Sequence, residues 1–484
     1  MRRHLSILVT ALMALLVSGC TLAPKYIRPD APVPARWPEY TAEVQSMAGS
    51  PTDSSAIAHA DSIPAEPETG LPPLAEFLPD VRLQELIDLA LANNRDLRIA
   101  ALNVERAREM FHIQRNELLP SIQGAGYVSR QHDPATVSGT GAELTSEYHT
   151  VELGIASWEI DFFGRVRSLK NAALEQYLAT AEARRAAQLS LQSQVAAAWL
   201  VLASDRDFQA LADSTLASQQ AGYTMMVRRV EVGMGSEIDL RRAQTGVDAA
   251  RDAVSRARLA VAQDRNALDL LAGAPVPARL LPQGWASIQM PRDIAVGLSS
   301  TVLLARPDVM AAEHQLMAAT ANMGAARAAF FPRISLTSLL GTASNALSGL
   351  FESDSGSWTF SGSAAMPIFD ARTFAAAKAT TANRNLILAQ YEKTIQTAFR
   401  EVCDALAVQA TIDGQMAARQ SWAEASGETY RLALERYDTG LDSYLSVLDA
   451  QRSYFAVQQS VIATRLAKYA NLVNLYAILG GGDA

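Results

Sequence analysis

The side chains best suited to chemistry show no spacing that fits a catalytic or metal site. The two cysteines, Cys20 and Cys403, lie far apart and form no CxxC pair. The sequence contains neither a G-x-S-x-G motif nor a glycine-rich phosphate loop. The six histidines also lack ligand spacing: His4, His59, His112, His132, His149 and His314. We therefore expect no catalytic residue, no metal and no bound cofactor, and an enzyme is the weakest functional class.

Cys20 carries a different signal, because it ends an N-terminal export sequence. Two arginines precede an apolar stretch over residues 5–17, and small side chains at 18 and 19 precede the cysteine. This stretch is too short to span a bilayer, so residues 1–19 are predicted to be a cleaved signal peptide. The ending resembles a bacterial lipobox, which implies acylation of Cys20 by diacylglyceryl and N-acyl groups such as palmitate. The alternative is a plain secretory signal.

Composition narrows the remaining classes. The chain has 484 residues, of which 49% are hydrophobic but only 7% aromatic and 19% charged. Much of the apolar share is alanine, the best helix former, so long and closely packed helices are expected. The formal charge of −8 argues against a nucleic-acid partner, which usually requires a basic surface. Eleven of the 20 prolines lie between Pro24 and Pro79 and predict an extended, lipid-anchored arm over residues 20–80.

The rest of the chain repeats one unit. A helical segment that starts at Asn94 and ends at Pro120 matches one from Arg306 to Pro332, at an offset of 212 residues. Further on, Gly233 matches Gly440 at an offset of 207. We predict a first repeat (81–275), a linker (276–296) and a second repeat (297–482). Each repeat contains a helix, a β-hairpin and two long helices: hairpins at 121–160 and 333–368, and helices at 164–232, 236–272, 371–438 and 443–479.

The hairpins have the features of membrane strands. Each candidate strand has about nine to eleven residues, the length that a tilted strand needs to cross a bilayer. Between the first two strands we expect a polar loop from His132 to His149. Aromatic residues stand at the strand ends that face the helices and predict an interfacial girdle: Trp158, Phe162, Phe163, Phe330, Phe331 and Phe369. Alternatively, these aromatics fill a junction between helices and sheet.

The long helices carry apolar residues at a sustained spacing of 3.5, which predicts coiled-coil seams. One such seam runs from Ala243 to Leu271 with a polar interruption at Asp264, and others start at Leu388 and Ala450. Four strands per chain cannot close a barrel, and an open sheet edge is not tolerated in lipid. Because about eight strands make the narrowest barrel, two or three chains must share one.

Together these features resemble the TolC/OprM outer-membrane factors of tripartite efflux pumps, and most closely the lipid-anchored OprM-type branch. The resemblance rests on the lipobox, the proline-rich arm, the duplication and three segments: Asn93 to Arg98, Ala325 to Pro332, and Leu448 to Ser453. It implies a mainly α-helical homotrimer whose 12-stranded β-barrel continues into a coiled-coil tunnel. It also implies location in the outer membrane, a periplasmic adaptor and an inner-membrane RND-type transporter as partners, and a role in antibiotic resistance.

The two turns between long helices should form the periplasmic tip. Glycines break the helices there, and Ser236 with Asp239 has the spacing of a capping box, while Ser443 can cap the last helix. We expect the adaptor to dock on these turns, through Gly233, Gly235, Ser236, Gly440 and Ser443.

The resemblance also implies gate residues: Asp449 in a ring of carboxylates, Leu445 as an apolar gate, and Tyr437 and Asp239 in the closing network. Alternatively, Asp239 is only part of a helix cap, and Asp449 only pairs with Arg452. Two departures stand out, because Ser446 and Asp442 replace an aspartate and an arginine found in TolC-type members. The leading function is a passive exit duct for drugs or other small toxic compounds. A type I protein-secretion duct and a structural coiled-coil lipoprotein are the alternatives.

Overall fold

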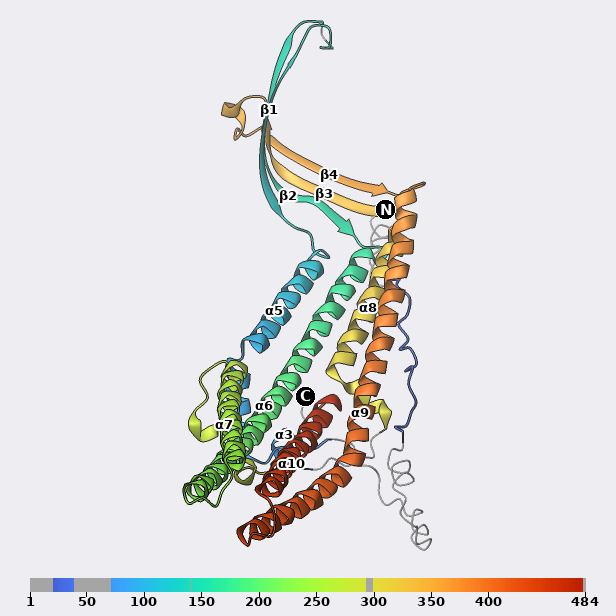
Figure 1. Ribbon diagram of the computed structural model, residues 1–484. Coiled ribbons are helices and arrows are strands. Elements are labelled where there is room, and N and C mark those ends of the chain that lie inside the picture. Colours follow the sequence, from blue (N-terminus) through green and yellow to red (C-terminus); the bar gives the residue numbers. More distant parts are fainter. Residues whose placement is uncertain (1–20, 39–70, 140, 293–298, 482–484) are drawn as a thin grey trace. The chain divides into compact units, whose positions relative to one another are not determined.

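The computed structural model of the chain describes residues 21–38, 71–139, 141–292 and 299–481 (Figure 1). The predicted signal peptide, Cys20 and the middle of the predicted arm lie outside the described residues. The chain divides into two compact units, one with residues 1–30, 103–181 and 311–392, and one with residues 31–102, 182–310 and 393–484. Over the described residues, no helix combines the length and apolar content needed to cross a bilayer.

The first unit contains one antiparallel sheet in the order β1-β2-β3-β4 (Figure 1). Its strands are β1 (Gln123–Asp133), β2 (Leu144–Ile160), β3 (Arg333–Ser344) and β4 (Gly356–Ala365). The two hairpins join through β2 and β3, and β1 and β4 are the outer strands. Glycine is required where β2 and β3 approach closely, since a Cβ at Gly341 would lie 2.1 Å from the Val151 carbonyl oxygen.

The expectation of a polar loop from His132 to His149 was wrong. The strands continue through most of it, so that Asp133 pairs with Leu144 and β2 reaches 17 residues. Polar side chains do not end a strand whose backbone groups are paired, and here they also pair with one another. The Arg130 guanidinium lies 3.1 Å from the Glu147 carboxylate across the hairpin. The strand lengths of 11, 12 and 10 residues for β1, β3 and β4 are close to the expected range.

Helices α5 (Arg95–Asn116) and α8 (Pro307–Ala328) precede the hairpins, and α6 (Arg165–Glu231) and α9 (Ala371–Asp438) follow them. In the first unit the start of the arm lies against α8. A Cβ at Gly324 would lie 2.6 Å from that of Ala23, so only glycine admits the arm there. Arg28 donates two hydrogen bonds to the buried carboxylate of Glu313, at 2.7 and 2.6 Å, and the Tyr26 hydroxyl donates a third.

The second unit holds the ends of α6 and α9, together with α7 (Glu237–Ala272) and α10 (Tyr444–Ile478). The predicted seam on α7 is buried at most of its positions, from Ala243 at 0% exposure to Leu268 at 0%, and partly buried at Val261, Asp264 and Leu271. On α9 the same spacing buries Tyr391, Ile395, Ala398, Val402 and Ala405. Asp264 interrupts the α7 seam beside Asp205 of α6, and burial with that neighbour raises the pKa of Asp264 to about 6.

The second unit also contains short elements: α3 (Leu74–Phe77), α4 (Val81–Asn93), η2 (Ala278–Leu280), η3 (Trp285–Ser287) and η4 (Ser300–Ala305). In the second hairpin connection lies η5 (Leu347–Gly349). The described part of the predicted linker is well packed, since Trp285 is 1% exposed.

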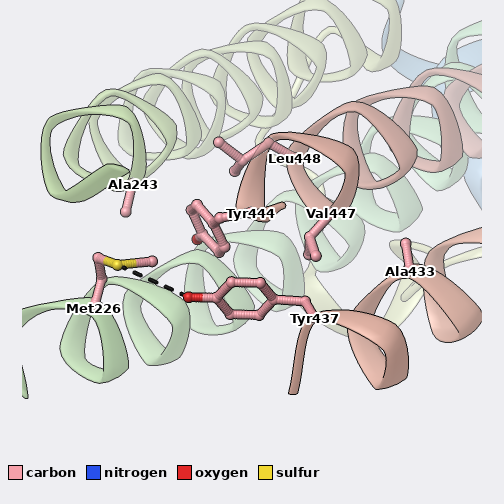
Figure 2. Packing of buried hydrophobic residues seen from close by; sticks show 7 residues of the cluster. All are labelled: Met226, Ala243, Ala433, Tyr437, Tyr444, Val447 and Leu448. Carbon is pink, nitrogen blue, oxygen red and sulfur yellow. Dashed lines mark hydrogen bonds between the residues drawn. The ribbon is translucent and has the colours of Figure 1, made fainter. Parts of the chain in front are cut away.

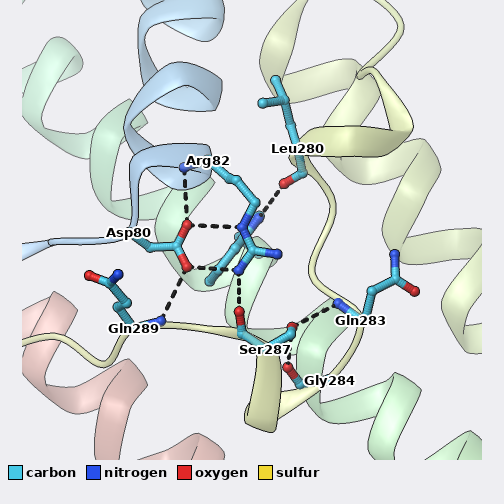
Figure 3. A network of polar contacts seen from close by, with 8 residues as sticks. Asp80, Arg82, Leu280, Gln283, Gly284, Ser287 and Gln289 are labelled. Carbon is cyan, nitrogen blue, oxygen red and sulfur yellow. Dashed lines mark hydrogen bonds and ion pairs between the residues drawn. The ribbon is translucent and has the colours of Figure 1, made fainter.

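A polar network fixes α4 to this segment (Figure 3). Asp80 caps α4 by accepting from the Arg82 backbone N–H at 3.0 Å, and it also accepts from the Gln289 N–H at 3.1 Å. The Arg82 guanidinium pairs with the same carboxylate at 2.8 Å and holds the pKa of Asp80 below its usual value against the effect of burial. Nearby, the Trp199 indole N–H donates to the Leu280 carbonyl at 2.9 Å.

Candidate functional site

The two helix-reversing turns have the same backbone geometry. Gly233 and Gly440 adopt φ values of 73° and 77°, in the left-handed region that favours glycine. The next residue in each turn donates a backbone hydrogen bond five residues back, Met234 to Arg229 and Leu441 to Arg436, both at 2.8 Å. These are the bonds of a Schellman motif, which satisfies the last carbonyls of a helix. Duplication of the sequence therefore reproduces the turn.

The two turns differ in how the following helix is capped. Ser236 accepts a hydrogen bond from the Ile238 N–H at 3.2 Å, as predicted, but Asp239 pairs with Arg242 at 3.3 Å instead of completing a capping box. The expectation that Ser443 caps α10 was wrong, because its side chain makes no cap hydrogen bond. The carboxylate of the preceding residue, Asp442, makes the side-chain hydrogen bonds at the start of α10 instead.

The Asp442 carboxylate accepts from the Ser446 hydroxyl at 2.8 Å and from the Ser443 N–H at 2.7 Å. The Arg436 guanidinium also lies 3.5 Å from it. These bonds, the one from Ser446 first, hold the pKa of the Asp442 carboxyl below its usual value. The second turn is therefore organised by an aspartate for which the first turn has glycine, at Gly235.

A buried hydrophobic cluster joins the two repeats next to these turns (Figure 2). We call it the tip cluster: Met226, Ala243, Ala433, Tyr437, Tyr444, Val447 and Leu448. The Tyr437 hydroxyl points to the Met226 sulfur at 4.0 Å, and the rings of Tyr437 and Tyr444 lie 5.3 Å apart. Burial raises the pKa of Tyr444 to about 12. The Arg229 guanidinium lies 4.6 Å from the centre of the Tyr437 ring, a cation–π contact between α6 and α9.

A buried amide pair also links the repeats, and the sequence analysis missed it. The Gln219 side-chain amide donates to the Gln451 amide oxygen at 2.8 Å, and Gln451 donates to Ser218 at 3.2 Å. The available signal was Gly246, a glycine inside α7. A Cβ at this position would lie 2.5 Å from the Gln219 amide oxygen, so glycine makes room for the pair.

The residues assigned to the gate by resemblance do not all gather in one place. Tyr437 lies in the tip cluster and is buried, and Asp239 is close enough to Tyr444 to raise the pKa of that hydroxyl further. Leu445 is 41% exposed. Asp449 is also exposed and lies 4.0 Å from Arg452, at the outer limit of an ion pair. Within one chain Leu445 and Asp449 therefore lie outside the tip cluster, and their gate roles stay predictions.

The aromatic residues at the strand ends divide into packed and exposed ones. The rings of Phe163 and Phe331 stack at 4.9 Å, Phe330 lies 5.0 Å from Phe374, and the Trp158 indole donates to the Leu118 carbonyl at 3.3 Å. Phe369 is 87% exposed and Phe162 36%. Some of these rings thus fill the junction and others face outward. Further exposed apolar residues were missed: Trp358, Phe360, Ile368 and Phe374.

Among the described residues, no group of three or more His, Cys, Asp or Glu side chains could hold a metal ion. Cys403 is a buried thiol on α9. Cys20 lies outside the described residues, so its acylation stays a prediction. The candidate functional site is therefore made of the two turns and the tip cluster, in which helices of both repeats are packed together.

Known proteins resemble the chain over nearly all of its length. A family model described as Outer membrane efflux protein matches residues 86–274 and 298–481, two matches as expected for a duplicated chain. A toluene efflux pump outer membrane protein of Pseudomonas putida, TtgC, is 41% identical over 99% of this chain and 96% of its own. Outer membrane protein OprJ of Pseudomonas aeruginosa is 39% identical over 97% and 95%.

Two solved structures have the same fold. The CusC structure, whose title concerns transmembrane channel formation, has a TM-score of 0.81 at 35% identity and covers 96% of this chain and 100% of its own. The open state of the Neisseria gonorrhoeae MtrE outer membrane channel has a TM-score of 0.80 at 34% identity and covers 96% and 98%.

Proposed function

The chain belongs to the outer membrane efflux proteins, and from this premise we propose that it is a gated exit duct that closes at the two helix-reversing turns. Its location in the outer membrane, its role as an efflux-pump channel and its mainly helical fold with a duplicated helix–hairpin–helix unit agree with the sequence analysis. The observation that carries the proposal is the match to efflux-pump outer membrane proteins over nearly the whole chain.

We propose that three copies form the duct. Each chain contributes four strands, and the outer strands β1 and β4 have no partner in the described sheet. An unpaired edge is costly in lipid, so the sheet must close through other copies. Three copies supply 12 strands around one axis, enough to enclose a bore, and the long helices would continue the wall into the periplasm.

We propose small apolar toxic compounds as the substrate class. The relatives are named for toluene, solvent and antibiotic efflux, and toluene and other organic solvents are small apolar compounds. A type I protein-secretion duct and a structural scaffold have no such support among these relatives. We propose no catalytic activity and no bound cofactor for the chain apart from the lipid on Cys20, which would anchor it to the outer membrane.

We propose an inner-membrane RND-type transporter and a periplasmic adaptor as partners, with the adaptor docking on Gly233, Gly235, Ser236, Gly440 and Ser443. Tyr437 and Asp239 would hold the tip shut, and Leu445 and Asp449 would narrow the bore on the threefold axis. Three carboxylates on one axis would concentrate negative potential and favour cations. The exposure of Leu445 and Asp449 within one chain supports this placement, because it leaves both side chains accessible to a bore that other copies would complete.

Two experiments test the proposal. Expression in a strain that lacks its own efflux channels, together with a matching adaptor and transporter, should restore toluene and antibiotic resistance. In planar bilayers, Asp449→Ala and Leu445→Ala should raise the resting conductance of the purified protein. Asp248→Ala is the matched control, since Asp248 pairs with Arg251 at the same i,i+3 spacing on an exposed face of α7. If all three variants conduct like the wild type, the assignment of Leu445 and Asp449 to the gate is refuted.

A further inference from the structure

The four-stranded sheet has two faces of different chemistry. Residues that pair across an antiparallel sheet share a face, and so does every second residue along a strand. By this rule one face carries exposed large apolar side chains from all four strands: Val128, Val151, Leu153, Leu340, Trp358 and Phe360. On β4 the opposite face carries hydroxyl side chains, at Ser357, Thr359, Ser361 and Ser363. We call the first one the apolar face, and it suits contact with lipid chains.

The apolar face ends near the height expected for the outer edge of the hydrocarbon layer. On β3 this face runs from Ile334 to Ser344, the last residue of β3 that pairs with β2. Ten steps of about 3.3 Å along a strand tilted by roughly 35–45° rise about 23–27 Å, close to the apolar band of about 25 Å in outer-membrane barrels. Beyond His149, the partner of Ser344, β1 and β2 form a two-stranded ribbon that projects past β3 and β4 (Figure 1). With the helices on the periplasmic side, this ribbon stands outside the hydrocarbon at the cell exterior.

A polar cluster occupies the apolar face where the ribbon begins. We call it the outer cluster: Arg130, His132, Glu147 and His149. Arg130 lies opposite Glu147 in the register, and each histidine lies two residues further along one of the same strands, so all four share this face. A Glu147 carboxylate oxygen lies 3.1 Å from Nε of Arg130, and the Arg130 side chain is 72% exposed. The terminal nitrogens of this guanidinium therefore remain available to another acceptor.

His149 is buried without a hydrogen bond. Only 10% of its side chain is exposed, and neither ring nitrogen has a hydrogen-bond partner among the described residues. Its Nε2 lies 3.7 Å from a Glu147 oxygen, beyond hydrogen-bonding distance. The Thr342 hydroxyl, on the same face of β3, is likewise buried and has no partner in the described part of the chain. Because buried polar atoms in native proteins nearly always have a partner, these side chains are suited to bond a polar group from outside the chain.

We propose that the outer cluster binds a phosphate group of the glycolipid in the outer leaflet of the outer membrane. The inference rests on the proposed function and adds a lipid ligand to it. The position identifies the ligand, because a side chain on the lipid side of the sheet and just beyond the hydrocarbon meets lipid headgroups. Three basic side chains stand there against one carboxylate, as in other basic pockets that bind lipid headgroups.

Each member of the outer cluster has a part in this contact. The planar guanidinium of Arg130 presents its terminal nitrogens to two phosphate oxygens at once, while Glu147 orients it through Nε. The His149 ring donates a further hydrogen bond from the edge of the hydrocarbon. His132, whose Nδ1 lies 3.0 Å from the Thr145 hydroxyl, is held with its other ring nitrogen free to donate. The bound phosphate would fix the height of the sheet in the membrane, which apolar contacts alone leave free to shift.

The first test measures the binding of lipid A to the full-length channel in detergent by native mass spectrometry. One probe carries both phosphates, and the other is the same lipid after enzymatic removal of its phosphates. The wild type should bind the phosphorylated lipid about tenfold more tightly, Arg130→Gln should lose about that factor, and His149→Gln should lose about threefold. Arg251→Gln is the matched control and should bind like the wild type, since Arg251 is 60% exposed and pairs with Asp248 at 2.9 Å on α7.

A second measurement tests the apolar face without changing the outer cluster. In vesicles whose acyl chains carry bromine, contact with the chains quenches tryptophan fluorescence. Trp358→Phe should reduce the quenched fraction, because Trp358 lies on the apolar face and is 76% exposed. Trp422→Phe is the control, since Trp422 is 59% exposed on α9 and should lie away from the chains. If Trp358→Phe leaves quenching unchanged, the apolar face does not contact lipid and the inference is wrong.

The outcomes separate the two proposals. If the wild type restores no resistance and does not insert into membranes, the proposed function fails, and this inference fails with it. If the wild type restores resistance but binds both forms of lipid A equally, or if Arg130→Gln binds like the wild type, only the lipid site is refuted. Displacement of the lipid by excess inorganic phosphate would show a site for free phosphate instead. If Arg130→Gln lowers the melting temperature of the oligomer without lipid A and leaves lipid binding intact, Arg130 contacts a neighbouring copy, which also overturns the inference.

Discussion

Arg28 of the arm and Glu313 of α8 form an ion pair, and we predict that replacing one partner destabilises the arm more than replacing the other. Glu313 is nearly buried, with 6% of its side chain exposed, whereas half of the Arg28 side chain is exposed. Arg28→Ala leaves the Glu313 carboxylate buried with only the Tyr26 hydroxyl as donor. Removing one partner of a fully buried pair costs roughly 3–5 kcal/mol, and with one partner half in water we expect about 2–3 kcal/mol.

Glu313→Ala should destabilise the arm less. The Arg28 guanidinium can turn into water, so the loss is one hydrogen bond from Tyr26 and a half-exposed ion pair, together about 1 kcal/mol. Hydrogen exchange of the amides of residues 21–30, followed by mass spectrometry, measures opening of the arm directly. At about 1.4 kcal/mol per factor of ten, exchange should accelerate about 30- to 150-fold in Arg28→Ala and about fivefold in Glu313→Ala.

The double variant provides the decisive comparison. Without Glu313, no buried carboxylate is left to penalise the loss of Arg28, so the double variant should exchange about as fast as Glu313→Ala. Lys25→Ala is the control, because Lys25 is exposed on the same segment and should leave exchange unchanged. Equal effects of the two single variants, or effects that add in the double variant, would refute the reasoning.

Three further predictions concern the second unit. The folded chain keeps the proton of Asp264 up to about pH 6 and the unfolded chain loses it near pH 4, so the free energy of unfolding should fall as pH rises between these values. Asp264→Asn removes the charge beside Asp205 and should raise the free energy of unfolding at pH 7.5 by on the order of 1 kcal/mol after solvent screening. Denaturant titrations should show this gain at pH 7.5 and no change at pH 4. Gly273→Ala should lower the free energy of unfolding, measured by the same titration, by about 2–4 kcal/mol, since φ is 67° and the new Cβ would lie 2.4 Å from the Asn93 backbone oxygen of α4. Gly233→Ala, with open space around its Cβ, should lower it by only about 1 kcal/mol. Trp199→Phe should lower the free energy of unfolding by about 1–3 kcal/mol, because the Leu280 carbonyl of η2 loses its indole donor. The same titration measures this loss, and an unchanged midpoint would show that water replaces the indole.

Much of the fold could be predicted because its signals are local or periodic. The seam from Ala243 to Leu268 follows from a spacing of 3.5, which fixes one face of a helix without knowledge of its partner. The turns at Gly233 and Gly440 follow from the need for a residue that tolerates positive φ. These features depend on neighbours within a few residues along the chain.

The remaining features depend on which segments meet across the fold. The extension of β2 comes from backbone pairing between residues such as Asp133 and Leu144, which polar side chains do not prevent. The Gln219–Gln451 pair joins residues 232 positions apart, and neither residue is unusual on a helix. The Arg229–Tyr437 contact likewise joins residues of different repeats. Spacing along one helix carries no information about such contacts.

The duplication explains why the two turns can differ in chemistry while keeping one geometry. Each turn needs a glycine at one position and a backbone hydrogen bond five residues back, and both repeats meet this requirement. That bond joins backbone groups only, but a Cβ at Gly235 would lie 2.9 Å from the Val230 backbone nitrogen, so the first turn requires glycine where the second has Asp442. The Asp442 carboxylate lies 3.5 Å from Arg436 in its own turn, whereas Arg229 of the other turn lies over the Tyr437 ring. The same pattern of backbone hydrogen bonds therefore builds two turns whose side chains make different contacts across the tip.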